Sequence, residues 1–161
     1  MTSAAERTRE EIIASNLAAV EVHFHNETPE TIDKAVAVYT DDIVWEVPAR
    51  GLVHRDRETV KQEYLKIFGS MNVHKITNLH RFATEEWVFD DSIFEFTIGG
   101  DGFTNCPFQP GTRVSMLLIH DFQCRDGKIC RENGYEIWRR ADDERLVRDD
   151  IPEDAVVQEF A

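Results

Sequence analysis

The sequence predicts an α+β domain in which three N-terminal helices cover one face of a curved, mostly antiparallel sheet. Helical hydrophobic periodicity dominates about the first 70 residues and is interrupted by one strand pattern. Only strand patterns follow, up to about residue 138. The chain has 161 residues, of which 42% are hydrophobic, including ten Phe, so it is long enough for one domain with a substantial core.

The first helix is predicted over residues 5–27, where hydrophobic side chains recur at steps of three and four. They form one stripe, with Arg and Glu on the other side of the helix: Ile13, Leu17, Val20 and Phe24. A second helix is predicted to start at residues 28–30, "TPE", because Thr can cap a helix, Pro suits its first turn and Glu favours its positive end. It is expected to run to about Tyr39.

A strand follows in "DIVWEVP", where Ile43, Trp45 and Val47 share one face. A third helix is predicted from about Asp56 to Gly69, because a glycine commonly ends a helix. The apolar side of this helix consists of Val60, Tyr64, Ile67 and Phe68.

Four further strands are predicted over residues 74–83, 87–98, 112–124 and 128–138. The "DG" pair at residues 126–127 predicts a tight hairpin turn between the last two. A two-residue loop pairs Cys124 with Ile129 rather than with Cys130, so no disulfide is expected there. A Gly- and Pro-rich loop with two Phe lies before the third of these strands and has the length of a functional lid or a variable surface loop.

The charge and the ends of the chain exclude several classes of partner. A net charge of −13 disfavours nucleic acid and anionic membrane surfaces, because both are negatively charged. No apolar run approaches the roughly 18 residues that a membrane-spanning helix needs. The N-terminal "MTSAAERTREE" lacks the apolar segment of a secretory signal, and the three cysteines form no CxxC motif. A cytoplasmic location with reduced cysteines is therefore expected.

Residues 1–138 are expected to form a single domain, since no repeat and no linker composition interrupts them. Residues 139–161 carry eight acidic and four basic side chains, so this segment contributes −4 of the net charge. It is interpreted as an acidic C-terminal extension that lies on the surface or packs against a second subunit.

Two segments, "AVYTDDIVWEVP" and "DFQCRDGKI", resemble the nuclear-transport-factor-2-like superfamily, and the similarity covers roughly residues 8–138. An acidic pair leading into a strand with Trp, followed late by a "DGKI" hairpin, is typical of this cone-shaped α+β fold. Its enzymes include ketosteroid isomerase, scytalone dehydratase, hexachlorocyclohexane dehydrochlorinase and the SnoaL-like polyketide cyclases. The resemblance implies a ligand cavity between the helices and the concave sheet, and a homodimer or higher homo-oligomer formed sheet to sheet. It selects no single activity, because the fold hosts enzymes and passive binders alike.

The resemblance implies His74 as a general base. His74 begins "HKITNL", which is similar to the "HYGTNL" stretch that starts with the catalytic histidine of the dehydrochlorinase. In that enzyme the histidine is paired with an Asp at the end of the first helix, and no Asp is present there in this sequence. Glu27, three residues beyond Phe24, is the nearest carboxylate and is expected to take the place of that Asp.

Three more residues match functional positions of ketosteroid isomerase. His23 falls where the isomerase carries its oxyanion Tyr, His120 falls near its second oxyanion donor, and Tyr64 matches a Tyr on its third helix. His23 and His120 are expected as catalytic residues and Tyr64 as a substrate-binding residue. Each can also be read as an ordinary core residue, because both histidines lie in apolar stretches and a tyrosine often buries its ring.

The family bases themselves are absent. The position of the isomerase base is occupied by Val47, and the acid/base Asp of the SnoaL-like cyclases falls at Gly134. The usual chemistry of these two enzymes is therefore not expected. Trp45 and Phe103 are expected to bind substrate as apolar residues of the cavity or its lid, although ordinary packing explains them as well.

Strand geometry places four polar residues. His74 and His80 lie six positions apart in one predicted strand, so a regular strand points both to the same face. They would be roughly 20 Å apart at 3.3 Å per residue, too far for one site, and His80 is interpreted as outer surface or subunit contact. Only one of His120 and Asp121 can face inward, because neighbouring strand residues alternate.

No metal and no cofactor are expected, because the sequence has no short ligand spacing such as HExxH. His23 and His25 stand two apart on a predicted helix, where their side chains diverge. Convergence of His23, His74, His120 and Glu27 on a metal remains the alternative.

These observations lead to three hypotheses. The first is a cofactor-independent lyase or isomerase, dehydratase-like, that acts on a small, mostly apolar, oxygenated organic ligand. Histidine titrates nearest to neutral pH of all side chains, so a neutral imidazole can accept a substrate proton. The second is a non-catalytic binding protein of the same fold, and the third is a structural dimerisation module.

Overall fold

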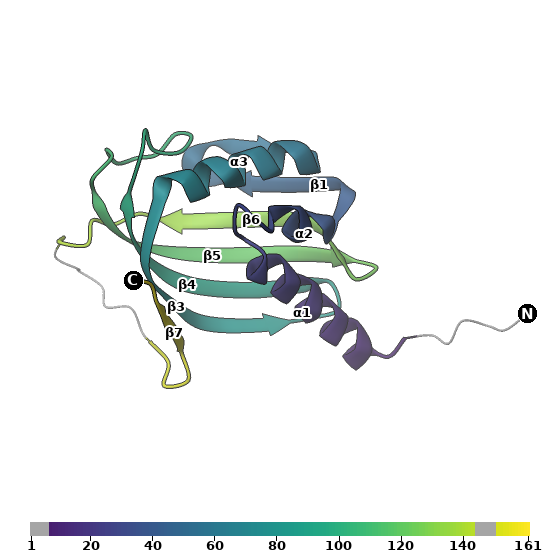
Figure 1. Cartoon of the computed structure of the whole chain (residues 1–161). Helices are drawn as coiled ribbons and strands as arrows, with labels where there is room; N and C mark the ends of the chain where they lie inside the picture. Colours follow the sequence, from purple (N-terminus) through teal and green to yellow (C-terminus); the bar gives the residue numbers. More distant parts are fainter. Residues whose placement is uncertain (1–6, 144–150) are drawn as a thin grey trace, which may run out of the picture.

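Helices α1 (Arg9–His25), α2 (Ile32–Ala37) and α3 (Arg57–Ser70) lie on one face of a curved seven-stranded sheet (Figure 1). This computed structural model describes residues 7–143 and 151–161. The remaining elements are β1 (Tyr39–Val47), the short 3-10 helix η1 (Pro48–Arg50), β2 (Leu52–His54), β3 (Met71–Ala83), β4 (Trp87–Ile98), β5 (Arg113–Arg125), β6 (Lys128–Ile137) and β7 (Val156–Glu159).

The strand order is β2-β1-β6-β5-β4-β3-β7. Every neighbouring pair is antiparallel except β1 and β6, which are parallel. The helices between β1 and β3 therefore connect distant parts of the sheet, while β3 to β6 follow one another as hairpins. This architecture confirms the predicted α+β fold with a curved, mostly antiparallel sheet.

Helix α1 begins with a capping box that is written in the sequence. The Thr8 side chain accepts a hydrogen bond from the Glu11 backbone, and the Glu11 carboxylate accepts one from the Thr8 backbone, so two otherwise unpaired amides are satisfied. The buried face of the helix is not a purely apolar stripe: it consists of Asn16, Ala19, Val20 and His23. A polar residue on this face needs a partner inside the protein, and for His23 that partner is part of the site described below.

Helix α3 begins where the sequence predicts it, because Asp56 accepts a hydrogen bond from the Thr59 amide as its N-cap. Its buried residues include Glu63 and Tyr64 beside Val60. Helix α2 is shorter than predicted, since only residues 32–37 are helical and residues 28–31 form turns.

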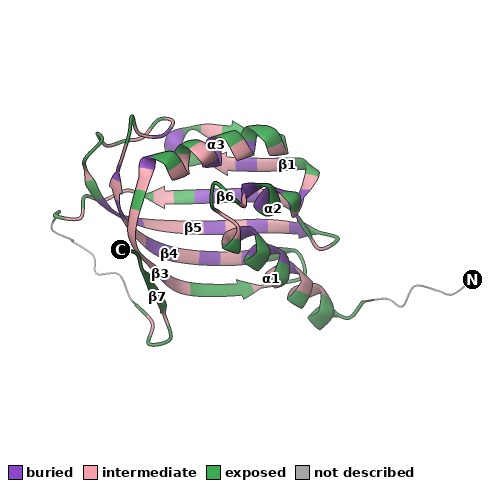
Figure 2. Cartoon of the chain, viewed as in Figure 1, coloured by how far each residue is buried: buried purple, intermediate pink, exposed green. Residues whose placement is uncertain are grey.

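The core lies between the helices and the inward faces of the strands. Ile43, Trp45 and Val47 are all buried, as their alternation predicts. The largest fully buried aromatic side chains are Tyr39, Phe96 and Phe122, and complete burial of such a side chain contributes roughly 1.5–3 kcal/mol. In Figure 2 the buried segments of the sheet lie behind the helices, while the outer faces of the helices and most of β7 are exposed.

The β5–β6 hairpin follows the sequence closely. Asp126 and Gly127 both have positive φ, the backbone that a tight two-residue turn requires and that Asp and Gly tolerate best. The register pairs Cys124 with Ile129, as predicted, and the three cysteines are free.

Strand β3 is irregular at two places. Val73 pairs with Phe96 and Lys75 with Glu95, so His74 is an extra residue in a β-bulge, and a second shift lies between Asn78 and His80. A bulge interrupts the alternation of faces, because two residues of one strand oppose one residue of the other. This irregularity determines where the histidines of β3 point.

The C-terminal segment supplies β7, which the sequence does not predict. Val156–Glu159 pairs antiparallel with residues 75–78 of β3 and forms one edge of the sheet. Residues 144–150 of the predicted acidic extension, and residues 5–6 of the first predicted helix, lie outside the described residues. In the portion of the chain that the structure describes, no helix is long and apolar enough to cross a membrane.

Candidate active site

A cavity of about 1020 Å³ lies between the helices and the sheet. It is partly open to solvent. Its apolar wall includes Phe24, Val47, Ile67, Phe68, Met71, Val73, Ile76, Phe94, Met116 and Leu118. Polar side chains interrupt this wall at several places, and two of them, one around Glu132 and one around Arg50, contain fully or almost fully buried charges.

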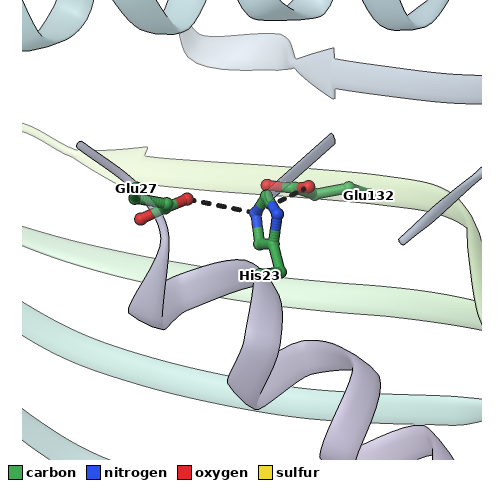
Figure 3. A group of neighbouring side chains, drawn as sticks. All are labelled: His23, Glu27 and Glu132. Atoms are coloured by element: carbon green, nitrogen blue, oxygen red, sulfur yellow. Dashed lines mark ion pairs between the residues drawn. The ribbon is translucent and has the colours of Figure 1, made fainter. Parts of the chain in front are cut away.

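The first polar place is built around His23, which comes from the buried face of α1 and is fully buried. Its Nε2 lies 3.1 Å from Oε1 of Glu27 and 3.4 Å from Oε2 of Glu132. Figure 3 shows that Glu27 follows α1 and Glu132 comes from β6, so two carboxylates far apart in the sequence point at one imidazole. We call His23, Glu27, Glu132 and the tyrosines Tyr39 and Tyr64 the His23 network.

The charges of the His23 network are fixed by its geometry. Burial by itself would lower the pKa of His23, but Glu132 and Glu27 outweigh burial and raise that pKa from 6.5 to about 10. Burial by itself would raise the pKa of Glu132, but His23 above all, with His120 and Tyr39, lowers it from 4.5 to about 2. At neutral pH the pair is therefore an imidazolium and a carboxylate, and Nδ1 of His23 donates to the Ala35 carbonyl at 3.3 Å.

Two tyrosines complete the network. The Tyr39 hydroxyl donates to Oε2 of Glu132 at 2.5 Å, and the Tyr64 hydroxyl donates to Oε1 at 2.8 Å. Burial and the nearby carboxylate hold the pKa of both phenols well above 10, so both remain donors. Trp45 in turn donates its indole N–H to the Tyr64 oxygen at 3.3 Å.

His120 lies beside this network and lines the cavity, whereas His23 lies behind the wall. Its Nε2 is 3.8 Å from Oε1 of Glu132, and its ring stacks on Phe122 and meets Phe24 edge-on. Nδ1 of His120 is buried and has no hydrogen-bond partner within the described residues. Opposite His120 on β6 stands Gly134, whose lack of a side chain leaves space beside the imidazole.

The structure brings together most of the residues that the sequence singles out. Tyr64, Trp45, Glu27 and Phe103 line the cavity with His120, while Asp121 points to the other face of the sheet and binds Asn133. Phe103 is buried and belongs to a second apolar cluster with Phe96, Ile98, Val114 and Met116.

His74 does not join them. Its Nε2 hydrogen bonds to Oγ1 of Thr97 at 2.8 Å, and His74 is not among the residues that line the cavity. Because His74 is the extra residue of the bulge, Val73 takes the cavity side that a regular strand would give to position 74. The expected contact between His74 and Glu27 is therefore wrong, and Glu27 pairs with His23 instead.

His80 is exposed, in line with its interpretation as outer surface or subunit contact, since 52% of its side chain is accessible. It also lies at the rim of the cavity, where Nδ1 is 2.9 Å from Oδ1 of Asp91. The second register shift of β3 lies just before His80 and contributes to this position.

Sequence reasoning missed Glu132, Tyr39 and the buried Arg50. Glu132 lies in "ICRENGYEI", where a charged residue reads as the solvated side of a strand. The alternation of the strand is the one available signal, because it places Glu132, Gly134 and Glu136 on the same face of the sheet. The structure shows that this face is the cavity side.

Three ligand atoms of the His23 network could hold a metal ion. Those of His23, Glu27 and Glu132 lie within 4.8 Å of one another. The spacing suits a small divalent cation, but Nε2 of His23 holds a proton at neutral pH, and a metal would have to displace it.

The chain is similar to proteins of one known family. The SnoaL-like domain family matches residues 20–132. The chain belongs to this family. The SnoaL-like family is part of the nuclear-transport-factor-2-like superfamily, so the predicted resemblance is confirmed. No curated protein sequence matches the chain.

Solved structures with the same fold are distant in sequence. A Mycobacterium tuberculosis LEH-like epoxide hydrolase is 19% identical, with a TM-score of 0.58, covering 78% of this chain and 84% of its own. A candidate polyketide cyclase from Xanthomonas campestris pv. campestris is 15% identical, with a TM-score of 0.62, over 77% and 91%. An NTF2-like protein from Burkholderia xenovorans is 14% identical, with a TM-score of 0.65, over 78% and 91%. At these identities the likeness shows the fold alone.

The arrangement can carry out proton transfer. A cavity-lining imidazole stands next to an ionised carboxylate that two phenols and an imidazolium hold in place. If His120 takes up a proton, the carboxylate of Glu132 stabilises the imidazolium that forms. The fixed charges need no reorganisation during such a step.

Proposed function

We propose that the protein is a cofactor-independent acid/base enzyme, a lyase or isomerase, that acts on a small, mostly apolar, oxygenated organic molecule in the cavity. The observation that supports this most is His120, a cavity-lining imidazole whose Nε2 lies 3.8 Å from an ionised, buried carboxylate and whose Nδ1 has no hydrogen-bond partner in the described part of the chain. Residues whose charge is tuned by buried partners next to a cavity are typical of functional sites.

In the proposed reaction, His120 takes the proton from a carbon next to a carbonyl group, and the electron pair of that C–H bond moves toward the carbonyl. For dehydration, a carbon–carbon double bond forms and the imidazolium returns the proton to the departing hydroxyl, which leaves as water. For isomerisation, the same proton returns to a different carbon. Glu132 stabilises the imidazolium in both cases, and Tyr64 and Trp45 orient the substrate at the wall.

His74 is not given a role in this proposal. The resemblance of His74 to a dehydratase base favours dehydration, but His74 binds Thr97 and does not line the cavity. The proton acceptor in this proposal is His120, and His23 and Glu27 act through Glu132 rather than on the substrate.

Deuterium exchange tests the proposal without knowledge of the natural substrate. A panel of aryl and cyclic ketones and β-hydroxy ketones is incubated with the protein in D2O, and loss of the α-proton signals is followed by NMR. Both lyase and isomerase chemistry begin with this abstraction, so catalysed exchange of at least one compound is expected. His120→Ala and His120→Asn should slow it by about 10²-fold or more. His74→Ala is the matched control and should leave it unchanged.

Full exchange in both folded His120 variants would overturn the proposal. A loss of exchange in His74→Ala, with an intact fold by circular dichroism, would overturn it as well. Exchange of none of the ketones that bind would favour the second candidate.

The second candidate is a non-catalytic binding protein of the same fold. The hydrogen bonding of Glu132 favours this candidate, because two phenols and an imidazolium already satisfy the carboxylate, as in a purely structural network. Such a protein would bind apolar molecules in the cavity, and His120→Ala would change affinity alone.

The sheet face opposite the cavity supports the expected homo-oligomer. Tyr135 and Ile137 alternate with the cavity-lining residues of β6, so they lie on the outer face, where they are 42% and 48% exposed. Their cross-strand neighbours on β5 are Ile119 and Leu117. Light scattering is expected to give the mass of a dimer or higher oligomer, and Tyr135→Lys with Ile137→Lys should reduce it to a monomer.

A further inference from the structure

The second polar place in the cavity wall is a buried guanidinium held by two carboxylates. Nε of Arg50 donates to Oε2 of Glu136 at 3.0 Å, and Nη1 donates to Oε1 of Glu63 at 3.0 Å and to the Thr104 carbonyl at 3.0 Å. We call Arg50, Glu63 and Glu136 the Arg50 cluster. Arg50 is 3% exposed, and Phe103 lies under the guanidinium, with 4.8 Å from Cζ to the ring centre.

One part of this guanidinium is unused. An Arg side chain has five N–H groups, of which two belong to Nη2. Nη2 of Arg50 is buried and has no hydrogen-bond partner within the described residues, although Arg50 lines the cavity. Buried donors without a partner are costly and therefore rare in native proteins, so an acceptor is missing at this point.

Hydrogen bonds at Nε and Nη1 hold the guanidinium in place, so Nη2 does not find that acceptor by a swing of the whole side chain. Three elements fix the guanidinium: η1 carries Arg50, α3 carries Glu63 and β6 carries Glu136. Nη2 has almost no surface open to water, although Arg50 lines the cavity, so a molecule bound in the cavity supplies the acceptor once a small shift of the covering side chains exposes Nη2. A preorganised donor of this kind loses little entropy when it binds.

Charge selects the kind of acceptor. Two carboxylates already face one guanidinium. Glu63 also has the His54 imidazole at 3.9 Å and the Lys66 ammonium at 3.6 Å, and Lys66 is 61% exposed and therefore well solvated. A carboxylate ligand would place a third negative group against one cation in a buried setting, which is unfavourable. An uncharged oxygen, such as a carbonyl, accepts the N–H groups without that penalty.

The two polar places lie along the same strand. His120 pairs with Gly134, and Gly134 stands two positions before Glu136 on β6, so His120 and Glu136 are separated by roughly 7 Å along the strand at 3.3 Å per residue. A molecule that reaches from His120 to Arg50 therefore needs an oxygen at each of these two points.

We infer that Arg50 and Phe103 form a second binding subsite, in which Nη2 of Arg50 donates to an uncharged carbonyl-type oxygen of the substrate while Phe103 covers the adjoining apolar part. The inference rests on the proposed function for the reacting end of the molecule, and it adds the substrate class: an uncharged, doubly oxygenated compound rather than an organic acid.

Binding of three matched probes tests the subsite without turnover. 2-Acetylnaphthalene has a neutral acceptor oxygen, 2-ethylnaphthalene has nearly the same shape without one, and 2-naphthoate replaces the ketone by a carboxylate. Their affinities for the full-length protein are measured by fluorescence titration. The ketone should bind at least about tenfold more tightly than the hydrocarbon, because it supplies the missing acceptor, and more tightly than the carboxylate.

Two variants assign the preference to this subsite. The triple variant Arg50→Met, Glu63→Gln and Glu136→Gln removes all charges of the Arg50 cluster together, so no buried charge is left unpaired. In this variant the ketone should lose its higher affinity, while the affinity for the hydrocarbon should persist. His120→Ala should retain the advantage even if it loses exchange activity, so failure of the proposed function and failure of this inference can be told apart.

A second measurement covers the case in which the triple variant does not fold. The carbonyl 13C resonance of labelled 2-acetylnaphthalene should move downfield on binding to the wild-type protein and to His120→Ala, because a hydrogen bond from a guanidinium withdraws electron density from the carbonyl. In the binding experiment, equal affinity for ketone and hydrocarbon, or tightest binding of the carboxylate, would overturn the inference. It would also be overturned by a ketone preference that survives in the folded triple variant, or by an unshifted carbonyl resonance in His120→Ala.

Discussion

The two polar clusters of the cavity differ in how well their central cation is satisfied. Nε2 of His23 has four oxygens within 3.4 Å, from Glu27, Glu132, Tyr39 and Tyr64. Nη2 of Arg50 is also buried and has no hydrogen-bond partner among the residues that the structure describes. The His23 network is complete without a ligand and fixes the local charges, whereas the Arg50 cluster is complete only when something binds. A buried charge therefore signals stability in one place and recognition in the other.

The largest effect is expected from removal of the central anion of the His23 network. Glu132→Leu leaves an imidazolium and two phenolic donors buried without their acceptor, so the free energy of unfolding should fall by about 3–5 kcal/mol. Urea denaturation at pH 7 measures it. Glu46→Leu is the matched control, because its pair with Arg131 is 28% and 34% exposed, and it should cost less than about 1 kcal/mol. Equal losses in the two variants would contradict the contrast.

The Arg50 cluster should behave differently when it is removed as a unit. Arg50→Met leaves Glu63 and Glu136 buried without their shared cation and should lower the free energy of unfolding by about 3 kcal/mol. The triple variant with Glu63→Gln and Glu136→Gln should return to within about 1 kcal/mol of the wild type, since no unpaired charge remains. A triple variant as unstable as the single one would show that the cluster holds the fold together rather than serving a ligand.

The pH dependence of stability follows from the His23 network. The pKa of His23 is raised from 6.5 to about 10 on folding, so its contribution is complete below pH 6.5 and is lost as the pH rises toward 10. The pKa of Glu132 is lowered from 4.5 to about 2, so its contribution is complete above pH 4.5 and is lost as the pH falls toward 2. The free energy of unfolding should therefore be highest between these two ordinary values.

Urea denaturation at pH 6 and at pH 9 measures the alkaline side. The free energy of unfolding should be lower at pH 9 by an amount on the order of 2 kcal/mol. His80→Gln, which changes an exposed histidine pair at the rim, should show the same decrease. A stability that stays constant or rises toward pH 9 would show that His23 is not held as an imidazolium.

The smallest effect is expected from removal of metal. A proton already occupies Nε2 of His23 at neutral pH, so His23, Glu27 and Glu132 should not retain a divalent ion. Dialysis against EDTA should leave the unfolding temperature unchanged, and elemental analysis of the purified protein should find no stoichiometric zinc. Stoichiometric metal in the purified protein, together with a lower unfolding temperature after its removal by EDTA, would contradict this prediction. It would show that a metal ion and not a proton occupies Nε2 of His23.

Local signals were enough to predict most of the fold. The face shared by Ile43, Trp45 and Val47 and the cap at Asp56 follow from rules that involve only neighbouring residues. The Asp-Gly turn sets the register of Cys124 with Ile129 for the same reason. The edge strand β7 was missed, because an exposed four-residue strand with mixed polarity has no pattern of its own.

The site was predictable only in part, because two of its features depend on distant contacts. The bulge at His74 adds one residue to β3 and reverses the face of that position, and nothing in "SMNVHKI" marks it. Glu132 is buried because His23, Tyr39 and Tyr64 from other elements meet it there, although a glutamate in a strand ordinarily points to water. Charge pairing across the fold overrode the local preference in that case.

The central claim is that His120, and not His74, is the histidine that a ligand in the cavity meets. Histidine-ring NMR on the wild-type protein, with the ring signals assigned through His120→Asn and His74→Asn, measures this directly during titration with 2-acetylnaphthalene. The ring signals of His120 should shift in a saturable manner while those of His74 stay in place. Shifts confined to His74, or none at His120 at saturation, would contradict the account.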